Sequence, residues 1–169
     1  MSSARSIAPR SLGFATLFSL LVSVVFMSGC GSGDPYSYVP ASGKVTYDDG
    51  SVIQAPQVRL TFIAVDPPTS GDEKIHARPG VVTADPKTGE FSDITSHKYG
   101  DGLLPGKHKV MVNPTDERGT ALDGVVPPEY RDAKQTPIEV DTNKPETFQI
   151  KVKKPAGGVK PVAGSGGHR

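Results

Sequence analysis

The side chains with the widest chemical repertoire in this chain are one cysteine and four histidines. They are Cys30, His76, His97, His108 and His168. No two histidines stand at the short spacing of metal-binding motifs, and no second cysteine could complete a ligand set. His97 and His108 flank one loop, so a two-histidine site is geometrically conceivable, although two strand residues at a solvated edge is the favoured interpretation. The sequence therefore predicts no metal, cofactor or catalytic site.

Several aspartates stand in segments that should form turns. They are Asp48, Asp49, Asp101, Asp116 and Asp132. Aspartate is common in turns because its carboxylate accepts hydrogen bonds from nearby backbone N–H groups. Their spacing does not match a calcium-binding hand, and calcium in one of these turns is a minority alternative. A Gly-x-Ser-x-Gly elbow, a phosphate-binding glycine loop and a dinucleotide fingerprint are also absent from the sequence, which argues against an enzyme.

Aromatic residues bear on carbohydrate binding, because sugar-binding sandwiches usually present exposed aromatic rings. The chain has no tryptophan, and its five tyrosines are Tyr36, Tyr38, Tyr47, Tyr99 and Tyr130. Tyr36 and Tyr38 precede the predicted domain, and Tyr130 is expected to pack a loop onto it. A carbohydrate-binding module is the second hypothesis, and it requires Tyr99 or Tyr130 to be exposed.

The first 29 residues have the organisation of a secretory signal. Arg5 and Arg10 lie in a segment without acidic residues, and residues 12–27 form a run of 16 uncharged residues. That order is typical of a signal peptide. A transmembrane helix needs about 20 apolar residues, so we expect residues 1–29 to be a helical signal peptide rather than a permanent span.

The end of this segment, Met27-Ser28-Gly29-Cys30, resembles the lipobox of bacterial lipoproteins, in which leucine and two small residues precede a cysteine. The resemblance implies that a signal peptidase recognises Met27, Ser28 and Gly29. It also implies lipidation of Cys30, with a diacylglyceryl group on the thiol and a further chain such as palmitate on the new amino terminus. Two or more acyl chains anchor a protein stably, since each buried methylene contributes about 0.8 kcal/mol. Gly31, where an aspartate is absent, favours the outer membrane.

The charge balance excludes nucleic acid as a partner. Two of the 19 basic residues precede Cys30 and all 18 acidic residues follow it, so the predicted mature chain carries 17 against 18. A nucleic-acid-binding domain is expected to be strongly basic. The one local cluster, Lys151, Lys153 and Lys154, is interpreted as a solvated strand face, with a role at a membrane surface as the weaker alternative.

Beyond Cys30 the chain divides into a lipidated tether at 30–40, one domain at 41–154 and a tail at 155–169 that is expected to be disordered. The domain shows short stretches that alternate with period two and no helical periodicity, which predicts an all-β fold. Val58, Leu60, Phe62 and Ala64 should face the core, as should Phe148, Ile150 and Val152. The predicted strands are 43–47, 58–64, 80–84, 90–96, 107–112, 137–141 and 148–152. With one cysteine, no internal disulfide can form.

Four segments of this domain are similar to carboxypeptidase regulatory-like domains. They are residues 42–50 (SGKVTYDDG), 89–91 (GEF), 104–110 (LPGKHKV) and 126–138, which contains VPPEYRD. The resemblance implies an antiparallel β-sandwich of about seven strands, transthyretin-like or immunoglobulin-like, without catalytic activity of its own. Two departures are His108, where tyrosine is usual, and a long polar insertion at 66–78.

The resulting functional expectation is a non-catalytic lipoprotein of the cell envelope that acts as a scaffold or binds a partner. It should be membrane-anchored through Cys30, facing the periplasm or the cell surface. The partner is an unidentified envelope protein or glycan.

Overall fold

The computed structural model describes residues 36–68, 76–144 and 147–159. The predicted signal peptide, Cys30 with Met27, Ser28 and Gly29 before it, and the first part of the tether lie outside the described residues. So do the last ten residues of the predicted tail, whereas residues 155–159 form a turn in which the Gly158 N–H donates to the Pro155 carbonyl at 2.9 Å.

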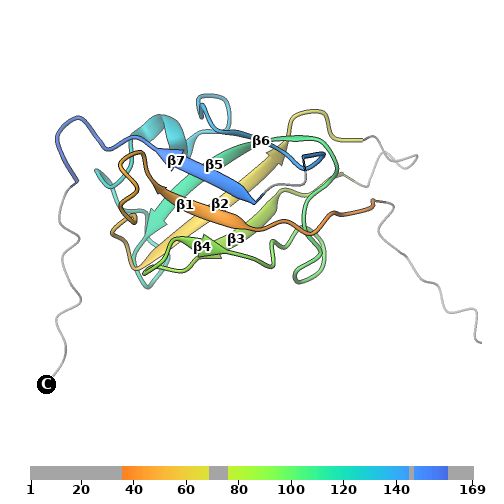
Figure 1. Cartoon of the computed structure of the whole chain (residues 1–169), viewed down its shortest axis with the longest axis horizontal. Coiled ribbons are helices and arrows are strands. Elements are labelled where there is room, and N and C mark those ends of the chain that lie inside the picture. Colours follow the sequence, from red (N-terminus) through yellow and green to blue (C-terminus); the bar gives the residue numbers. More distant parts are fainter. Residues whose placement is uncertain (1–35, 69–75, 145–146, 160–169) are drawn as a thin grey trace, which may run out of the picture. The chain divides into compact units, whose positions relative to one another are not determined.

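Seven strands form two sheets that face each other (Figure 1). The three-stranded sheet has the spatial order β4 (Glu90–Phe91), β1 (Gly43–Tyr47) and β7 (Phe148–Val152). The four-stranded sheet has the order β3 (Gly80–Ala84), β2 (Gln57–Ala64), β5 (Lys107–Thr115) and β6 (Glu139–Asp141). The predicted all-β sandwich of seven strands is confirmed.

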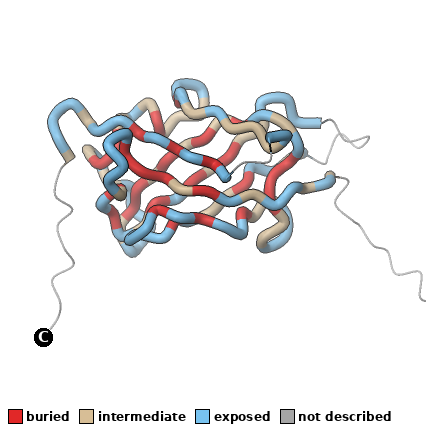
Figure 2. The backbone as a smooth tube through the Cα atoms, in the orientation of Figure 1, coloured by how far each residue is buried: buried red, intermediate tan, exposed pale blue. Residues whose placement is uncertain are grey.

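Buried and exposed side chains alternate along β2 and β7, one strand from each sheet. In β7, Phe148, Ile150 and Val152 are buried while the residues between them are exposed, as predicted. In β2, Val58, Leu60 and Phe62 are buried and Ala64 at the strand end is half-buried. Figure 2 shows the buried residues recurring along the strands. Successive side chains of a strand point to opposite faces of a sheet, so one apolar set covers the core.

The prediction of a wholly antiparallel sandwich is wrong for one pair. β1 and β7 run parallel, in register from Gly43 opposite Phe148 to Tyr47 opposite Val152. Alternating burial is the same for either strand direction, so the sequence pattern did not distinguish them. Because the two strands run in the same direction, the chain enters β1 at one end of the sandwich and leaves β7 at the opposite end (Figure 1). We name these the near end and the far end.

Two strands differ from their predicted lengths. The strand predicted at 90–96 ends at Phe91, and Thr95 forms only an isolated bridge with Val81. Asp93 between them has φ 55°, a left-handed conformation that breaks the strand and that aspartate tolerates better than most residues. β5 instead continues to Thr115, where Gln57 of β2 still pairs with it.

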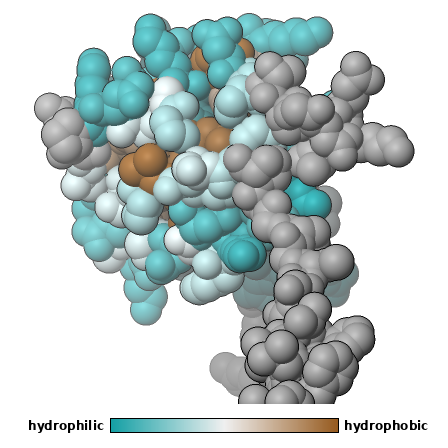
Figure 3. All heavy atoms as spheres, turned by 90° about the vertical axis from the view of Figure 1, so that its right-hand side faces the viewer, coloured by the Kyte–Doolittle hydropathy of each residue, from teal (hydrophilic) through white to brown (hydrophobic). Residues whose placement is uncertain are grey.

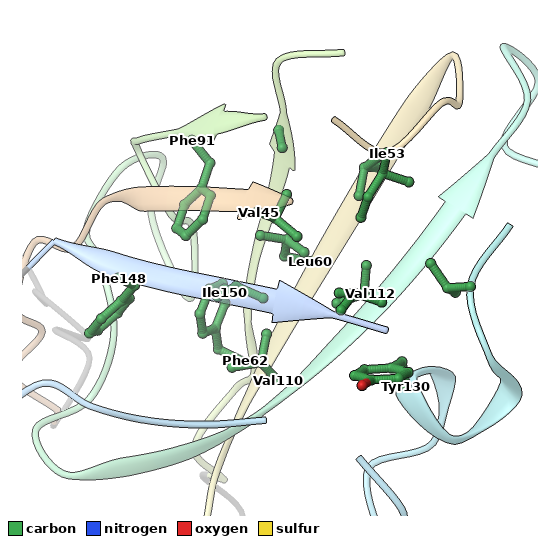
Figure 4. Packing of buried hydrophobic residues seen from close by; sticks show 14 of the residues in the cluster. Val45, Ile53, Leu60, Phe62, Phe91, Val110, Val112, Tyr130, Phe148 and Ile150 are labelled. Carbon is green, nitrogen blue, oxygen red and sulfur yellow. The ribbon is translucent and has the colours of Figure 1, made fainter. Parts of the chain in front are cut away.

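An aromatic cluster joins the two sheets towards the near end, where β1 and β7 begin. The Phe62 ring of β2 lies 5.9 Å from the Phe91 ring and 6.3 Å from the Phe148 ring, measured between centroids (Figure 4). Gly43 makes this possible, because a Cβ there would lie 2.5 Å from the Phe91 ring and 2.4 Å from the Phe148 carbonyl oxygen. Truncating a buried ring of this kind to alanine typically costs about 3–5 kcal/mol.

The far end is closed by the long connection between β5 and β6. Its 3₁₀ helix η2 (Pro128–Arg131) buries Tyr130, which is 3% exposed, and Val125 and Val126 are buried beside the sandwich. The Tyr130 hydroxyl accepts a hydrogen bond from the Lys153 N–H at 3.1 Å. The Tyr47 hydroxyl donates to the Val125 carbonyl at 2.8 Å. Tyr130 therefore packs a loop onto the sandwich, as predicted.

Candidate functional site

Most carboxylates with a perturbed pKa are used to build turns. Asp85 accepts the N–H groups of Thr88 and Lys87, and these bonds lower its pKa. The pKa of Asp116 is lowered in the same way by the N–H groups of Thr120 and Arg118. Of the predicted turn aspartates, Asp49, Asp101, Asp116 and Asp132 each accept a backbone N–H from a residue in their own turn. These carboxylates stabilise the local backbone of their turns.

The prediction that His108 lies at a solvated edge is wrong. It is 2% exposed, on the core side of β5, and its Nδ1 lies 3.2 Å from the Gly106 carbonyl oxygen. Burial lowers the pKa of His108, and the Gly106 carbonyl and Asp141 oppose that shift without reversing it. His97, by contrast, is an exposed loop residue. A buried ring in the core is not available to a two-histidine site.

The described domain carries a shallow groove of about 1320 Å³ on its surface. It follows the side of the sandwich where β3 and β4, the edge strands of the two sheets, lie next to each other. We call it the side groove. Its exposed polar lining includes Arg59 and Thr83 of the larger sheet, Arg78 before β3, and Ser92 and Asp93 after β4.

One exposed aromatic side chain stands at the side groove. Tyr99 is 86% exposed and belongs to its lining. The groove also contains both signs of charge, including an ion pair between Lys44 Nζ and Glu90 Oε1 at 3.8 Å. Arg59 and Arg78 are balanced by Asp85 and Asp93 along the same lining. Such a surface can bind a polar ligand of low net charge through hydrogen bonds and one aromatic contact.

Tyr99 is carried by a loop that hydrogen bonds hold in shape. Asp101 accepts the N–H groups of Ser96, His97 and Lys98 at 2.7–2.9 Å. Burial acts to raise the pKa of Asp101, but the three N–H donors outweigh it and the pKa lies below its ordinary value. The Ser96 hydroxyl also donates to the Gly102 carbonyl at 2.7 Å. Tyr99 is thus presented from a structured turn.

The described part of the chain contains neither a cluster of metal ligands nor a membrane-spanning helix. Among residues 36–68, 76–144 and 147–159, no three histidine, cysteine, aspartate or glutamate side chains are grouped so that they could hold a metal ion. In the same ranges no helix has the length and apolar character needed to cross a bilayer.

Comparison with known proteins does not identify a relative. A scan against protein-family models and searches of curated proteins and of solved structures find no match to this chain. Function must therefore be argued from the residues and their arrangement.

The predicted site residues and the observed surface lie in different parts of the chain. Cys30, Met27, Ser28 and Gly29 fall outside the described residues, so lipidation stays a prediction. The side groove was not predicted from the sequence, because its lining combines strands far apart in the chain. The available signal was the turn around Asp101, whose capping aspartate predicted a structured loop next to Tyr99.

Proposed function

We propose that this protein is a non-catalytic lipoprotein of the cell envelope whose β-sandwich serves as a structural or partner-binding module. The sequence Met27-Ser28-Gly29-Cys30, directly after an uncharged run, supports the anchor. The absence of an aspartate at position 31 favours the outer membrane, with the domain facing the periplasm or the cell surface. A partner is an envelope protein or glycan.

As part of the same proposal, we assign the sandwich to the transthyretin-like fold of carboxypeptidase regulatory-like domains. The placement of the similar segments supports it. Residues 43–47 of the first segment are β1, followed by the turn at Gly50, and Glu90–Phe91 of the second are β4. The third segment leads into β5, and the fourth contains η2. Each segment lies at a strand start, turn or closing loop that defines the fold.

The observation that carries the binding role is the side groove. Its exposed residues Arg59, Thr83 and Tyr99 have no role in the core, whereas most carboxylates with a lowered pKa cap turns and His108 is enclosed. Exposed polar and aromatic residues that stability does not require are typical of a recognition surface.

A photo-crosslinking amino acid tests this surface in the native envelope. Placed at Thr83 in the side groove, it should give a discrete adduct after irradiation of intact cells. Lys134, exposed in the closing loop and outside the lining of the groove, is the matched control. Identical adducts at both positions, or none at Thr83, would contradict a partner-binding groove.

The anchor is tested separately with Cys30→Ser. The wild-type chain should incorporate labelled palmitate and partition into the detergent phase of a cloud-point separation. The variant should do neither, because the thioether cannot form without the thiol. Equal labelling of the two proteins would show that Cys30 is not the lipidated residue.

A carbohydrate-binding module is the second candidate, favoured by the exposure of Tyr99 beside a polar groove. Tyr130 is excluded from such a role because it is 3% exposed. A glycan array should then show binding by the wild-type domain that Tyr99→Ala abolishes and Tyr99→Phe retains, because stacking depends on the ring. Binding that survives Tyr99→Ala would remove this candidate.

A further inference from the structure

The large apolar side chains that remain exposed are not scattered over the sandwich. Among the described residues they are Val39 at 36%, Val65 at 43% and Tyr99 at 86%. All three belong to connections at the near end, where the chain enters β1. Val39 precedes that strand, Val65 follows β2, and Tyr99 lies between β4 and β5. Figure 3 looks onto this end and shows a few hydrophobic residues at the surface among mostly hydrophilic ones.

Hydrogen bonds place these three connections at the same end. The N–H groups of Val39 and Leu103 each donate to the carbonyl of the other, at 2.7 and 3.0 Å, which ties the incoming chain to the loop that carries Tyr99. The Val65 N–H donates to the Lys107 carbonyl at 2.9 Å, at the start of β5. The near end is therefore a connected surface in which the exposed side chains have fixed positions.

The length of the tether keeps this surface close to any lipid on Cys30. Nine residue steps separate Cys30 from Val39, whose backbone is bonded to Leu103 of the sandwich. A flexible chain of that length has a root-mean-square span of roughly 15–18 Å, and even fully extended it reaches roughly 30 Å. A contact too weak to hold a free protein becomes significant when a tether keeps the effective concentration high.

The chemistry of the near end suits a lipid interface better than a purely electrostatic one. Tyrosine is enriched where membrane meets water, because its ring is apolar and its hydroxyl is polar. Lys98 next to it can extend its ammonium to the headgroups while its methylenes cover apolar surface. Acidic residues such as Asp66 and Asp93 are exposed at the same end, so net attraction to anionic lipid is not what would hold it.

We propose that the near end rests on the membrane surface, with Tyr99 in the headgroup region and Val39 and Val65 beside it. This inference rests on the proposed lipidation of Cys30. It fixes the orientation of the domain, since the parallel pairing of β1 and β7 then directs the closing loop and the end of β7 away from the bilayer. The membrane then occupies the side groove only at Tyr99, and the part of the groove lined by Arg59 and Thr83 stays open to solution.

The absence of tryptophan from the chain allows a direct test. Tyr99→Trp is introduced into the full lipidated protein, which is reconstituted into phosphatidylcholine vesicles with and without a quencher at the headgroup level. The emission of the introduced indole should shift to the blue and lose much of its intensity when the quencher is present. Lys87→Trp, at the exposed turn between β3 and β4, is the matched control and should keep the emission of a solvated indole.

The outcomes separate the two proposals. Protein that fails to co-sediment with vesicles would refute the anchor, and with it this inference. Co-sedimenting protein in which the indole of Tyr99→Trp is as solvated as that of Lys87→Trp would refute the membrane-facing orientation alone, as expected if Tyr99 binds a glycan instead. Equal quenching in both variants would also overturn it. Val65→Trp supplies a second reporter at the near end if Tyr99→Trp disturbs the loop.

Discussion

The loops at the two ends of the sandwich pack against it in different ways. At the far end, the closing loop buries Val125, Val126 and Tyr130 and is tied to distant strands by tyrosine hydroxyls. At the near end, the loop around Asp101 buries Ile94 and Leu103, but the turn that carries Tyr99 is held by hydrogen bonds within itself and leaves this side chain exposed. The tyrosine of the far end is therefore part of the core, whereas Tyr99 at the near end lies outside it and is available for contact.

The sharpest test of this contrast compares two tyrosines. Tyr130→Ala removes a buried ring and leaves the Lys153 N–H without its acceptor, so we expect a loss of about 3–5 kcal/mol in the free energy of unfolding. Tyr99→Ala should change it by less than about 0.5 kcal/mol, as for other surface substitutions. Urea titration of the Cys30→Ser background, which avoids the lipid, measures both. Similar losses in the two variants would remove the distinction between the ends.

A smaller effect is expected from Tyr47→Phe. This change deletes only the hydroxyl that donates to the Val125 carbonyl, and the buried carbonyl is left unpaired. Such a loss costs about 1–3 kcal/mol. Because the hydroxyl joins β1 to the closing loop, amide hydrogen exchange should rise around Val125 more than around Asp101. Uniform exchange at both ends would show that the loop is not held by this bond.

The smallest expected effect concerns pH at the near end. The folded pKa of His108 lies below its ordinary 6.5 because the ring is buried. Below pH 6.5 the unfolded chain then binds a proton that the folded chain does not, so stability falls as the pH is lowered from 6.5 towards the folded pKa. His108→Leu should flatten this part of the profile, while Tyr47→Phe should leave its shape unchanged. A wild-type profile that is level across this range would contradict the assignment.

Much of the strand content could be predicted from local patterns. β1 and β3 match their predicted ranges, and β7 has the predicted inward set, because its buried and exposed residues alternate with period two. The strand after Gly89 could not be predicted in length. It ends before Asp93, which takes a left-handed backbone that nothing in the residue types requires.

The candidate surface was less predictable than the fold. Tyr99 stands in a loop and Thr83 in a strand, and their shared groove exists because the edges of two sheets lie side by side. His108 was misplaced for a different reason, because its polar type was weighed above its position. It lies between two lysines in the sequence, but alternation with Val110 and Val112 places its ring on the inward face of β5.

The sequence by itself determined the all-β class, the inward faces of β2 and β7, and the turns capped by aspartate, because each of these depends on residues within a few positions of one another. It also supplied the expected anchor at Cys30. Only the tertiary structure decided the parallel pairing of β1 with β7 and the exposed residues of the near end. These features depend on which distant segments meet. The alternation of residues along a strand does not specify which strand pairs with it or in which direction that strand runs.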